Sequence, residues 1–393
     1  MDFRLPVLDP LPPHELPGND CSRGVFFVRS LDMRHDLLAL PAVILMTALL
    51  AGCSGKNPHY DPDQPHHTPT GFQNNYPHSR PGGLDFWRWF VQRRLAGLPK
   101  KPTLELAPVA PDLEYLQANR LEPAVTWIGH ATVLLQMGGL NILTDPIFSR
   151  RASPVQWAGP KRWQPPGVAL DELPRIDLVL ISHSHYDHLD LNSVRGVAAQ
   201  PGGSPLFVVP LGLKEWFERH VPGSHGHVRD FDWWENLEMD VEEPRTTVHF
   251  VPAQHWSQRT LRDRNRTLWG GWVVEQPDFV FYYAGDLGYS QDIKDIGERF
   301  GGFDLAAIPV GAYEPRWFMR SQHINPEEAV LVHQDVQAQR SMGVHWGTFH
   351  GITDEPLDQP IADLAEARDR HGLTEDDFFL LRHGETRRLD DNS

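Results

Sequence analysis

Four metal-binding side chains lie within six consecutive residues, in the run His183-Ser184-His185-Tyr186-Asp187-His188. Imidazole nitrogens and a carboxylate oxygen suit zinc and similar divalent cations. In an extended loop, side chains two residues apart point the same way, so His183 and His185 face one point. If a helix begins near Asp187, then Asp187 and His188 turn toward a second point. The run can therefore hold two cations, and the alternative is a solvated, histidine-rich loop.

The elements that must position this run read as short buried strands. The run directly follows the apolar stretch 177–182, which is rich in β-branched residues and has a proline just upstream. Further candidates follow other apolar stretches in the same manner: His255 after 247–252, Asp286 after 279–285, and His345 after 341–344. Loops at the ends of strands carry functional groups on a rigid sheet. The sequence therefore predicts one site at the edge of a sheet.

The natural partition of these residues gives two metal sites with a shared ligand. One cation takes His183, His185 and His255, the other takes Asp187, His188 and His345, and Asp286 bridges the two. Open positions remain for a hydroxide shared by the cations, as a catalytic rather than a structural site requires.

The spacing H-x-H-x-D-H, followed by a histidine, an aspartate and a histidine, resembles the metallo-β-lactamase superfamily. Within it, the chain is similar to the N-acyl-phosphatidylethanolamine-hydrolysing phospholipases D over approximately residues 121–389. The resemblance rests on stretches that extend well beyond the metal-binding residues, namely Thr126 to Thr132, Leu143 to Ser149, Gly159 to Arg162, Gln254 to Trp256, Gly285 to Tyr289, Ala312 to Phe318 and Gln322 to Ala329.

The resemblance implies all seven ligands named above, with two zinc ions, and places His323 in the active site beside them. It implies hydrolysis of N-acyl-phosphatidylethanolamine to N-acylethanolamine and phosphatidic acid, with the hydroxide that bridges the metals as nucleophile near Asp286. The chemistry is consistent, because two cations about 3.5–4 Å apart neutralise a phosphodiester and clamp its attacking and leaving oxygens.

His323 has two interpretations. It can act as a general acid or orient the phosphate, since histidine titrates near neutral pH. It can equally be structural, because Asn325, Pro326 and two glutamates after it indicate the start of a helix. Two other residues are expected to support the metal ligands: His130 as a packed or supporting residue, and Asp145, which follows a predicted strand at 140–144.

Composition limits the function. The chain has 393 residues, 40% of them hydrophobic, and a formal net charge of −16, so the basic surface expected of a nucleic-acid-binding protein is missing.

From about residue 120 we interpret the chain as one αββα sandwich, two packed β-sheets with helices outside. Two further functions stay open: a metal-dependent lactonase or other hydrolase on this scaffold, and a non-catalytic lipid-binding envelope lipoprotein.

The N-terminal part of the sequence predicts that the protein is located in a bacterial cell envelope. The apolar stretch Leu37 to Leu50 is typical of a signal-peptide core and ends in Leu50-Ala51-Gly52-Cys53, which resembles a lipobox. We expect lipidation of Cys53, translation from Met33, and a membrane-anchored protein facing the periplasm. The alternative is a genuine N-terminal extension with a short interfacial helix.

The expected domain organisation follows from these features. Residues 1–53 are the mis-assigned start and signal peptide, 54–83 a proline-rich tether, 84–119 an amphipathic helical segment, and 120–393 the hydrolase domain. Leu84, Trp87, Val91, Leu95 and Leu98 recur at helical spacing among arginines. Such a helix can lie on a membrane surface or pack against the catalytic domain, and both remain open. The expected partners are a phospholipid substrate and a membrane surface, with a homodimer also open.

Overall fold

The computed structural model describes residues 55–239 and 244–389. The predictions for Met33, the stretch 37–50 and Cys53 therefore lie outside the described residues. Within the described ranges, no helix combines the length and the apolar character that crossing a membrane would require.

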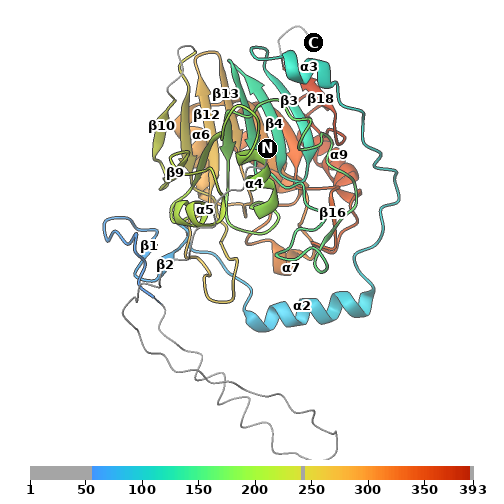
Figure 1. Cartoon of the computed structure of the whole chain (residues 1–393). Helices are drawn as coiled ribbons and strands as arrows, with labels where there is room; N and C mark the ends of the chain where they lie inside the picture. The colour runs from blue at the N-terminus through green and yellow to red at the C-terminus, as the bar shows by residue number, and fades with distance from the viewer. Residues whose placement is uncertain (1–54, 240–243, 390–393) are drawn as a thin grey trace, which may run out of the picture. The chain divides into compact units, whose positions relative to one another are not determined.

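Two seven-stranded mixed sheets form the centre of the protein (Figure 1). The first sheet, in spatial order, contains β18 (Thr386–Arg388), β3 (Ala124–Gly129), β4 (Thr132–Met137), β5 (Leu140–Thr144), β7 (Leu178–Leu180), β8 (Leu206–Pro210) and β9 (Val228–Phe231). The second contains β10 (Asn236–Glu238), β11 (Thr247–Val251), β12 (Gly271–Gln276), β13 (Phe279–Tyr283), β14 (Phe303–Pro309), β15 (Ala338–Val344) and β17 (Phe378–Phe379).

The central strands of both sheets bury both of their faces, which explains their apolar sequences. In β4, Val133 and Leu135 belong to the large core that also contains Phe250 and Trp272 of the second sheet. Leu134, between them, belongs to a separate core beneath helices of the first sheet. This alternation follows from the two-residue period of a strand, and it places the main core between the sheets.

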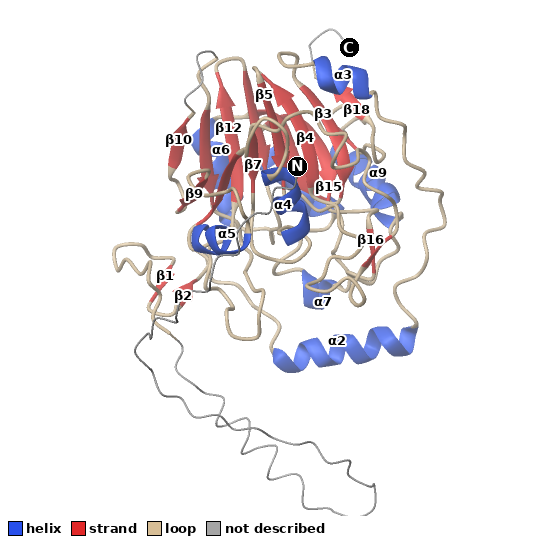
Figure 2. Ribbon diagram, in the orientation of Figure 1, coloured by secondary structure: helices blue, strands red, loops and turns tan. Residues whose placement is uncertain are grey.

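Helices cover the outer faces of the sheets (Figure 2). The cluster outside the first sheet includes side chains of α4 and α5, and α8 packs on β14 and β15 of the second sheet. The expected αββα sandwich is thus confirmed. The helices are α2 (Gly83–Ala96), α3 (Leu113–Ala118), α4 (Leu191–Ala198), α5 (Lys214–His220), α6 (Gln291–Phe300), α7 (Arg316–Met319), α8 (Pro326–Asp335) and α9 (Gln359–His371).

The strand directions bring the predicted site residues to one edge. Strands β5, β7 and β8 are parallel, as are β13, β14 and β15. Strand β11 is antiparallel to β12, which is antiparallel to β13, so β11 runs in the same direction as β13. The carboxyl ends of β7, β11, β13 and β15 precede the predicted ligands, and these ends gather the ligands from distant parts of the sequence.

The segment before α2 differs from the expected extended tether. It forms a small hairpin of β1 (His67–Thr68) and β2 (Gly71–Phe72) that packs on the catalytic domain. His66 and His67, which lie in the segment 54–83 interpreted as a proline-rich tether, are 4% and 7% exposed. Both imidazoles pair with Asp232, at 2.6 and 2.9 Å, and His66 stacks on Trp233. The contacts of these buried imidazoles with Asp232 and with the ring of Trp233 hold the segment, and composition alone could not predict them.

Candidate metal centre

The first group of predicted ligands converges around His185. Its Nδ1 atom lies 2.8 Å from His183 Nε2 and 3.3 Å from His255 Nε2. His183 and His255 are almost fully buried. The expectation that His183 and His185 face one point is therefore confirmed, and His255 joins them from the loop after β11.

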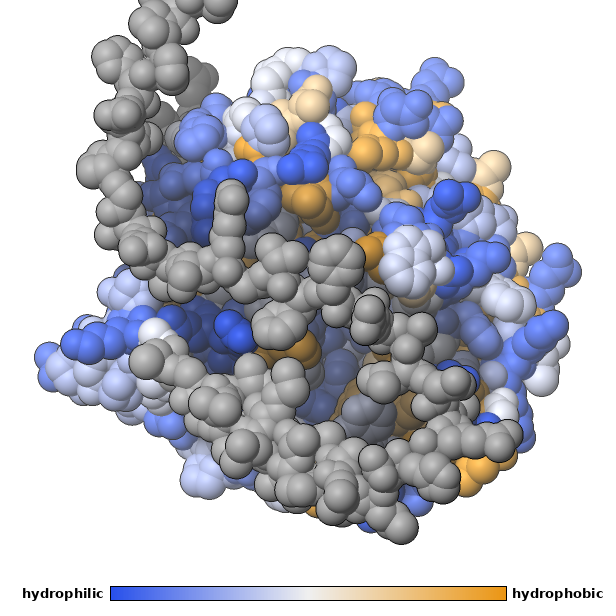
Figure 3. Space-filling view, turned by 60° about the horizontal axis from the view of Figure 1, so that its bottom comes forward, coloured by the Kyte–Doolittle hydropathy of each residue, from blue (hydrophilic) through white to orange (hydrophobic). Residues whose placement is uncertain are grey.

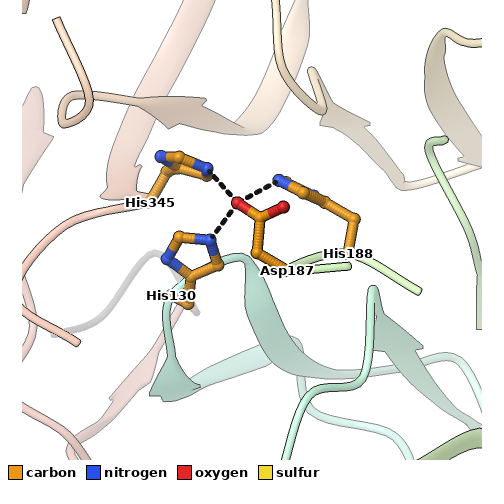
Figure 4. A group of neighbouring side chains, drawn as sticks. All are labelled: His130, Asp187, His188 and His345. Atoms are coloured by element: carbon orange, nitrogen blue, oxygen red, sulfur yellow. Dashed lines mark hydrogen bonds and ion pairs between the residues drawn. The ribbon is translucent and has the colours of Figure 1, made fainter. Parts of the chain in front are cut away.

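The second group gathers around Asp187, as Figure 4 shows. Its Oδ2 atom lies 3.4 Å from His345 Nε2 and 3.6 Å from His188 Nε2. A turn carries Asp187 and His188 to this position, where the start of a helix was considered from the sequence; the backbone N–H groups of His188 and Leu189 both donate to His185 O. Helix α4 begins later, at Leu191, with Asp190 as its N-cap.

Asp286 lies between the two groups. Its Oδ2 atom is 3.1 Å from His188 Nε2 and 3.8 Å from both His183 Nε2 and His255 Nε2. Its other oxygen, Oδ1, is 3.3 Å from His345 Nε2. The carboxyl group is 3% exposed. It thus occupies the position from which one carboxylate can serve both groups.

Hydrogen bonds at the outer nitrogens set the tautomers of three imidazoles. His255 Nδ1 donates to the carbonyl oxygen of Gln322 at 2.9 Å, and His188 Nδ1 donates to Asp145 at 2.6 Å. Ser182 Oγ donates to Asp145 and can therefore accept from His183 Nδ1 at 2.9 Å. In the neutral imidazole with its proton on Nδ1, Nε2 presents a lone pair to the centre, which is the form that binds a metal; His188 must give up any proton on Nε2 when a cation binds.

The electrostatics of the pocket favour added positive charge. Burial lowers the pKa of His183, His185 and His255, in the case of His185 to about 4, so these imidazoles are neutral. Burial alone would also lower the pKa of His188, but the carboxylates of Asp286 and Asp187 raise it well above its ordinary value. Within the described part of the chain, the basic groups that contact Asp187 and Asp286 are all imidazoles, so neither carboxylate faces a permanently charged side chain.

Several buried polar atoms at the centre have no hydrogen-bond partner among the described residues. They include His188 Nε2, His345 Nε2 and Asp286 Oδ1. Since buried polar atoms are nearly always paired, such atoms around the buried carboxylate of Asp286 and the partly buried one of Asp187 fit divalent cations. The nitrogen and oxygen donor set fits zinc.

Residues around the ligands support them as expected. His130 Nε2 lies 3.1 Å from Asp187 Oδ2, and Asp145 is fully buried beside His188. Asp145 accepts from the Ser182 backbone N–H, Ser182 Oγ, His188 Nδ1 and Tyr283 Oη, all within 2.7 Å. The supporting position of both residues is confirmed.

One supporting residue was missed. Asn74, in the segment interpreted as a tether, brackets the backbone of His255: its Nδ2 donates to His255 O at 3.0 Å, and its Oδ1 accepts from His255 N at 3.1 Å. Trp269 Nε1 donates to the same Oδ1 atom. No metal-ligand spacing or strand end marks Asn74 in the sequence, so only its three-dimensional contacts could identify it.

His323 lies at the rim of the centre and does not cap a helix. Its Nδ1 atom is 3.8 Å from Asp286 Oδ2, and burial lowers its pKa to about 4. Asn325 is the N-cap of α8, with a reciprocal bond from Glu328. Arg316 donates to the backbone oxygen of His323 at 2.9 Å and fixes it in place. The side chain is therefore available to a bound molecule.

Replacement of Asp145 by asparagine is expected to weaken metal binding. An amide at this position turns its NH₂ group toward hydrogen-bond donors, so His188 and His183 lose their orientation. Loss of such support lowers metal affinity by about 10–100-fold. Competition with a chromophoric chelator measures this affinity. Glu355→Gln is the matched control, because Glu355 is also a buried acceptor of several N–H groups yet contacts none of the predicted ligands.

Comparison with known proteins places these residues in a family context. Residues 140–346 match the model of the beta-lactamase superfamily domain. The chain is 45% identical to N-acyl-phosphatidylethanolamine-hydrolyzing phospholipase D 1 of Caenorhabditis elegans over 264 residues, which are 66% of this chain and 74% of that protein. It is 38% identical to the mitochondrial N-acyl-phosphatidylethanolamine-hydrolyzing phospholipase D of Saccharomyces cerevisiae, over 57% of this chain and 47% of that protein.

A solved structure supports the fold. The isothiocyanate hydrolase from Delia radicum gut bacteria superposes with a TM-score of 0.52 at 20% identity, covering 67% of this chain and 98% of that one. At this identity the likeness concerns the fold alone.

Proposed function

This chain belongs to the beta-lactamase superfamily of metal-dependent hydrolases and, within it, to the family of the N-acyl-phosphatidylethanolamine-hydrolysing phospholipases D, and we propose that it hydrolyses N-acyl-phosphatidylethanolamine to N-acylethanolamine and phosphatidic acid. One observation carries the proposal. Three buried imidazoles have their Nδ1 protons engaged outward and their Nε2 atoms turned toward a buried carboxylate, Asp286.

We assign the cations to the residues that converge there. His183, His185 and His255 would hold one zinc ion, Asp187, His188 and His345 the other, and Asp286 would contact both. Two such ions, when bound, offset the negative charge of a phosphodiester and lower the pKa of a coordinated water.

The chain's own residues then position the substrate. A phosphodiester seated on the centre comes within reach of His323, whose Nδ1 faces Asp286. His323 is placed to orient the phosphate by hydrogen bonding. To pass a proton to the departing N-acylethanolamine oxygen, its imidazole must first be protonated, which the negative charge of a bound phosphodiester favours against the burial that lowers its pKa to about 4. Its backbone is held by Arg316 and by the N–H bond to Met319 O, so the imidazole acts from a fixed position.

A lipid hydrolysis assay in water enriched in ¹⁸O tests the function. The proposed reaction forms a bond between water oxygen and phosphorus and breaks the bond from phosphorus to the N-acylethanolamine oxygen, which takes a proton. One ¹⁸O atom is therefore expected in phosphatidic acid and none in the N-acylethanolamine, measured by mass spectrometry. A chelator should stop the reaction and zinc restore it. Turnover of a lactone without release of phosphatidic acid would instead favour the alternative hydrolase.

The predicted location of the protein in the bacterial cell envelope remains a proposal. Lipidation of Cys53 would hold the enzyme at the membrane that contains its substrate, in the bacterial cell envelope. More than one acyl chain is needed for stable anchoring, as a lipidated N-terminal cysteine provides.

A further inference from the structure

Helix α2 is attached to the catalytic domain along one side. Trp89 Nε1 lies 3.2 Å from both carboxylate oxygens of Asp354, and Arg93 pairs with the same carboxylate at 3.2 Å. The ring of Trp89 stacks on that of Phe318, a residue of α7, with 5.1 Å between ring centroids. Trp89 and Arg93 are four residues apart and share one helix face, so this face fixes the helix on the domain.

The opposite side of α2 is apolar and uncovered. No residue of the helix is buried. Leu84, Trp87, Val91 and Leu95, spaced by three or four residues, are 86%, 61%, 51% and 85% exposed. Side chains at this spacing form a single stripe along a helix. A contiguous exposed apolar stripe of this kind marks an interaction surface rather than scattered surface residues.

The charge of the residues around this stripe indicates which kind of partner it binds. Residues 80–101 carry six basic residues and one acidic residue, a net charge of +5, in a chain whose net charge is −16. Arg88 lies against the ring of Trp317, a residue of α7 that is 43% exposed. A helix with an exposed aromatic and aliphatic stripe and flanking arginines fits the boundary between lipid headgroups and acyl chains of an anionic membrane.

A groove beside α2 extends toward the loops that carry residues of the metal centre. This groove of about 720 Å³ lies between the segment before α2 and α7, lined by Arg80, Asp85, Arg316 and Trp317 among others. Its wall also includes Gln254 and Ser321, which lie next to His255 and close to His323 in the chain. Helix α2 lies beneath α7 in the view of Figure 1. Where grey atoms do not cover the face turned forward in Figure 3, hydrophobic residues reach the surface among strongly hydrophilic ones.

We propose that the outer face of α2, formed by Leu84, Trp87, Val91 and Leu95, inserts into the surface of an anionic phospholipid bilayer. The docked helix brings the mouth of the groove against the lipid surface. A lipid headgroup can then enter the groove while its acyl chains remain near the bilayer. The reason for such docking, delivery of a lipid substrate, rests on the proposed function. The test measures how deeply α2 enters the bilayer and does not measure hydrolysis.

The experiment places a fluorescent label on the stripe of the full chain. Leu95→Cys is labelled with nitrobenzoxadiazole in a Cys21→Ser, Cys53→Ser background, which removes the two native cysteines. The matched control is Leu121→Cys, whose leucine is 72% exposed and follows α3 at the opposite end of the domain. Vesicles contain phosphatidylcholine with about one third phosphatidylglycerol, which supplies the anionic surface.

The label at position 95 is expected to shift to shorter wavelength on vesicles, to be quenched by spin-labelled acyl chains and to lose its quenching by iodide. The label at position 121 should keep its quenching by iodide. Arg88→Glu with Arg94→Glu should reduce these changes, and salt should reduce them in the unmodified helix. Because the label reports the depth of α2 itself, the result does not depend on which other part of the chain holds the protein to the vesicle.

Three outcomes overturn the proposal. The label at position 95 can remain quenched by iodide on bound vesicles, or the protein can fail to bind vesicles at all. A wavelength shift without vesicles that grows with protein concentration would instead assign the stripe to a second copy of the chain. Metal content and the release of phosphatidic acid from detergent-dispersed lipid test the proposed function separately, so failure of one proposal is distinguishable from failure of the other.

Discussion

The variant Asp286→Asn is expected to retain little hydrolytic activity and to bind less metal. Asp286 lies within 3.8 Å of imidazole nitrogens from both ligand groups, so an amide there weakens both proposed cation positions. The carboxylate also supplies the negative charge that a buried pair of cations requires. The loss should exceed the 10–100-fold effect typical of residues that support a ligand from outside the coordination sphere. Elemental analysis of the purified protein and steady-state rates measure both effects.

Asp292→Asn is the control for this prediction. Asp292 is also buried, but it bonds to Asn75 and Ser290 and faces none of the predicted ligands. Burial raises the pKa of its carboxyl group, so an uncharged amide suits its surroundings. The control should keep its metal and its rate. Full activity with unchanged metal content in Asp286→Asn would overturn the assignment of the metal centre.

The variant His323→Ala is expected to keep both cations and to turn over more slowly. Its Nδ1 atom lies at the rim, 3.8 Å from Asp286, and the donor groups proposed for the cations do not include it. Loss of a positioned proton-transfer group slows catalysis by about 10²–10⁴-fold. Metal analysis beside the steady-state rate separates a role in turnover from a role in structure.

His323→Gln distinguishes the two roles open to this residue. Glutamine keeps a hydrogen-bond donor near the same place but cannot transfer a proton at neutral pH. If His323 orients the phosphate, the glutamine variant should recover much of the rate, whereas a proton-transfer role leaves it as slow as the alanine variant. Loss of metal in either variant would make the residue structural, and an unchanged rate would make it a bystander.

The sequence predicts the site well where strand ends carry the ligands. Each predicted ligand follows an apolar stretch, and those stretches form β7, β11, β13 and β15. Parallel strands end at the same edge of a sheet, and so do two strands that are each antiparallel to the strand between them. An apolar strand followed directly by a potential ligand was therefore a sufficient local pattern to predict that these seven residues meet. The sandwich was predicted chiefly from the resemblance to the metallo-β-lactamase superfamily, because short strands that alternate with helical segments indicate an α/β fold but not the pairing of two mixed sheets.

The remaining features depend on contacts that have no local pattern. The support of His255 comes from a backbone oxygen, that of Gln322, and from a polar side chain in a proline-rich segment, Asn74. A carbonyl group is present in every residue, so sequence cannot mark the one that accepts a ligand's proton. The backbone conformation at Asp187 and His188, a turn rather than the start of a helix, also could not be predicted, because polar residues after a strand suit either structure.

The bracket that Asn74 forms around His255 has a practical consequence for protein production. Asn74 lies 181 residues before the histidine that it holds, and far ahead of the first strand of the sandwich, β3. A gene fragment trimmed to begin at β3 would encode every proposed ligand and both sheets, and would look complete in an alignment of domains. The loop that carries His255 would nevertheless have lost the two hydrogen bonds that Asn74 makes with its backbone. Expression boundaries for this chain should therefore be set ahead of the β1–β2 hairpin.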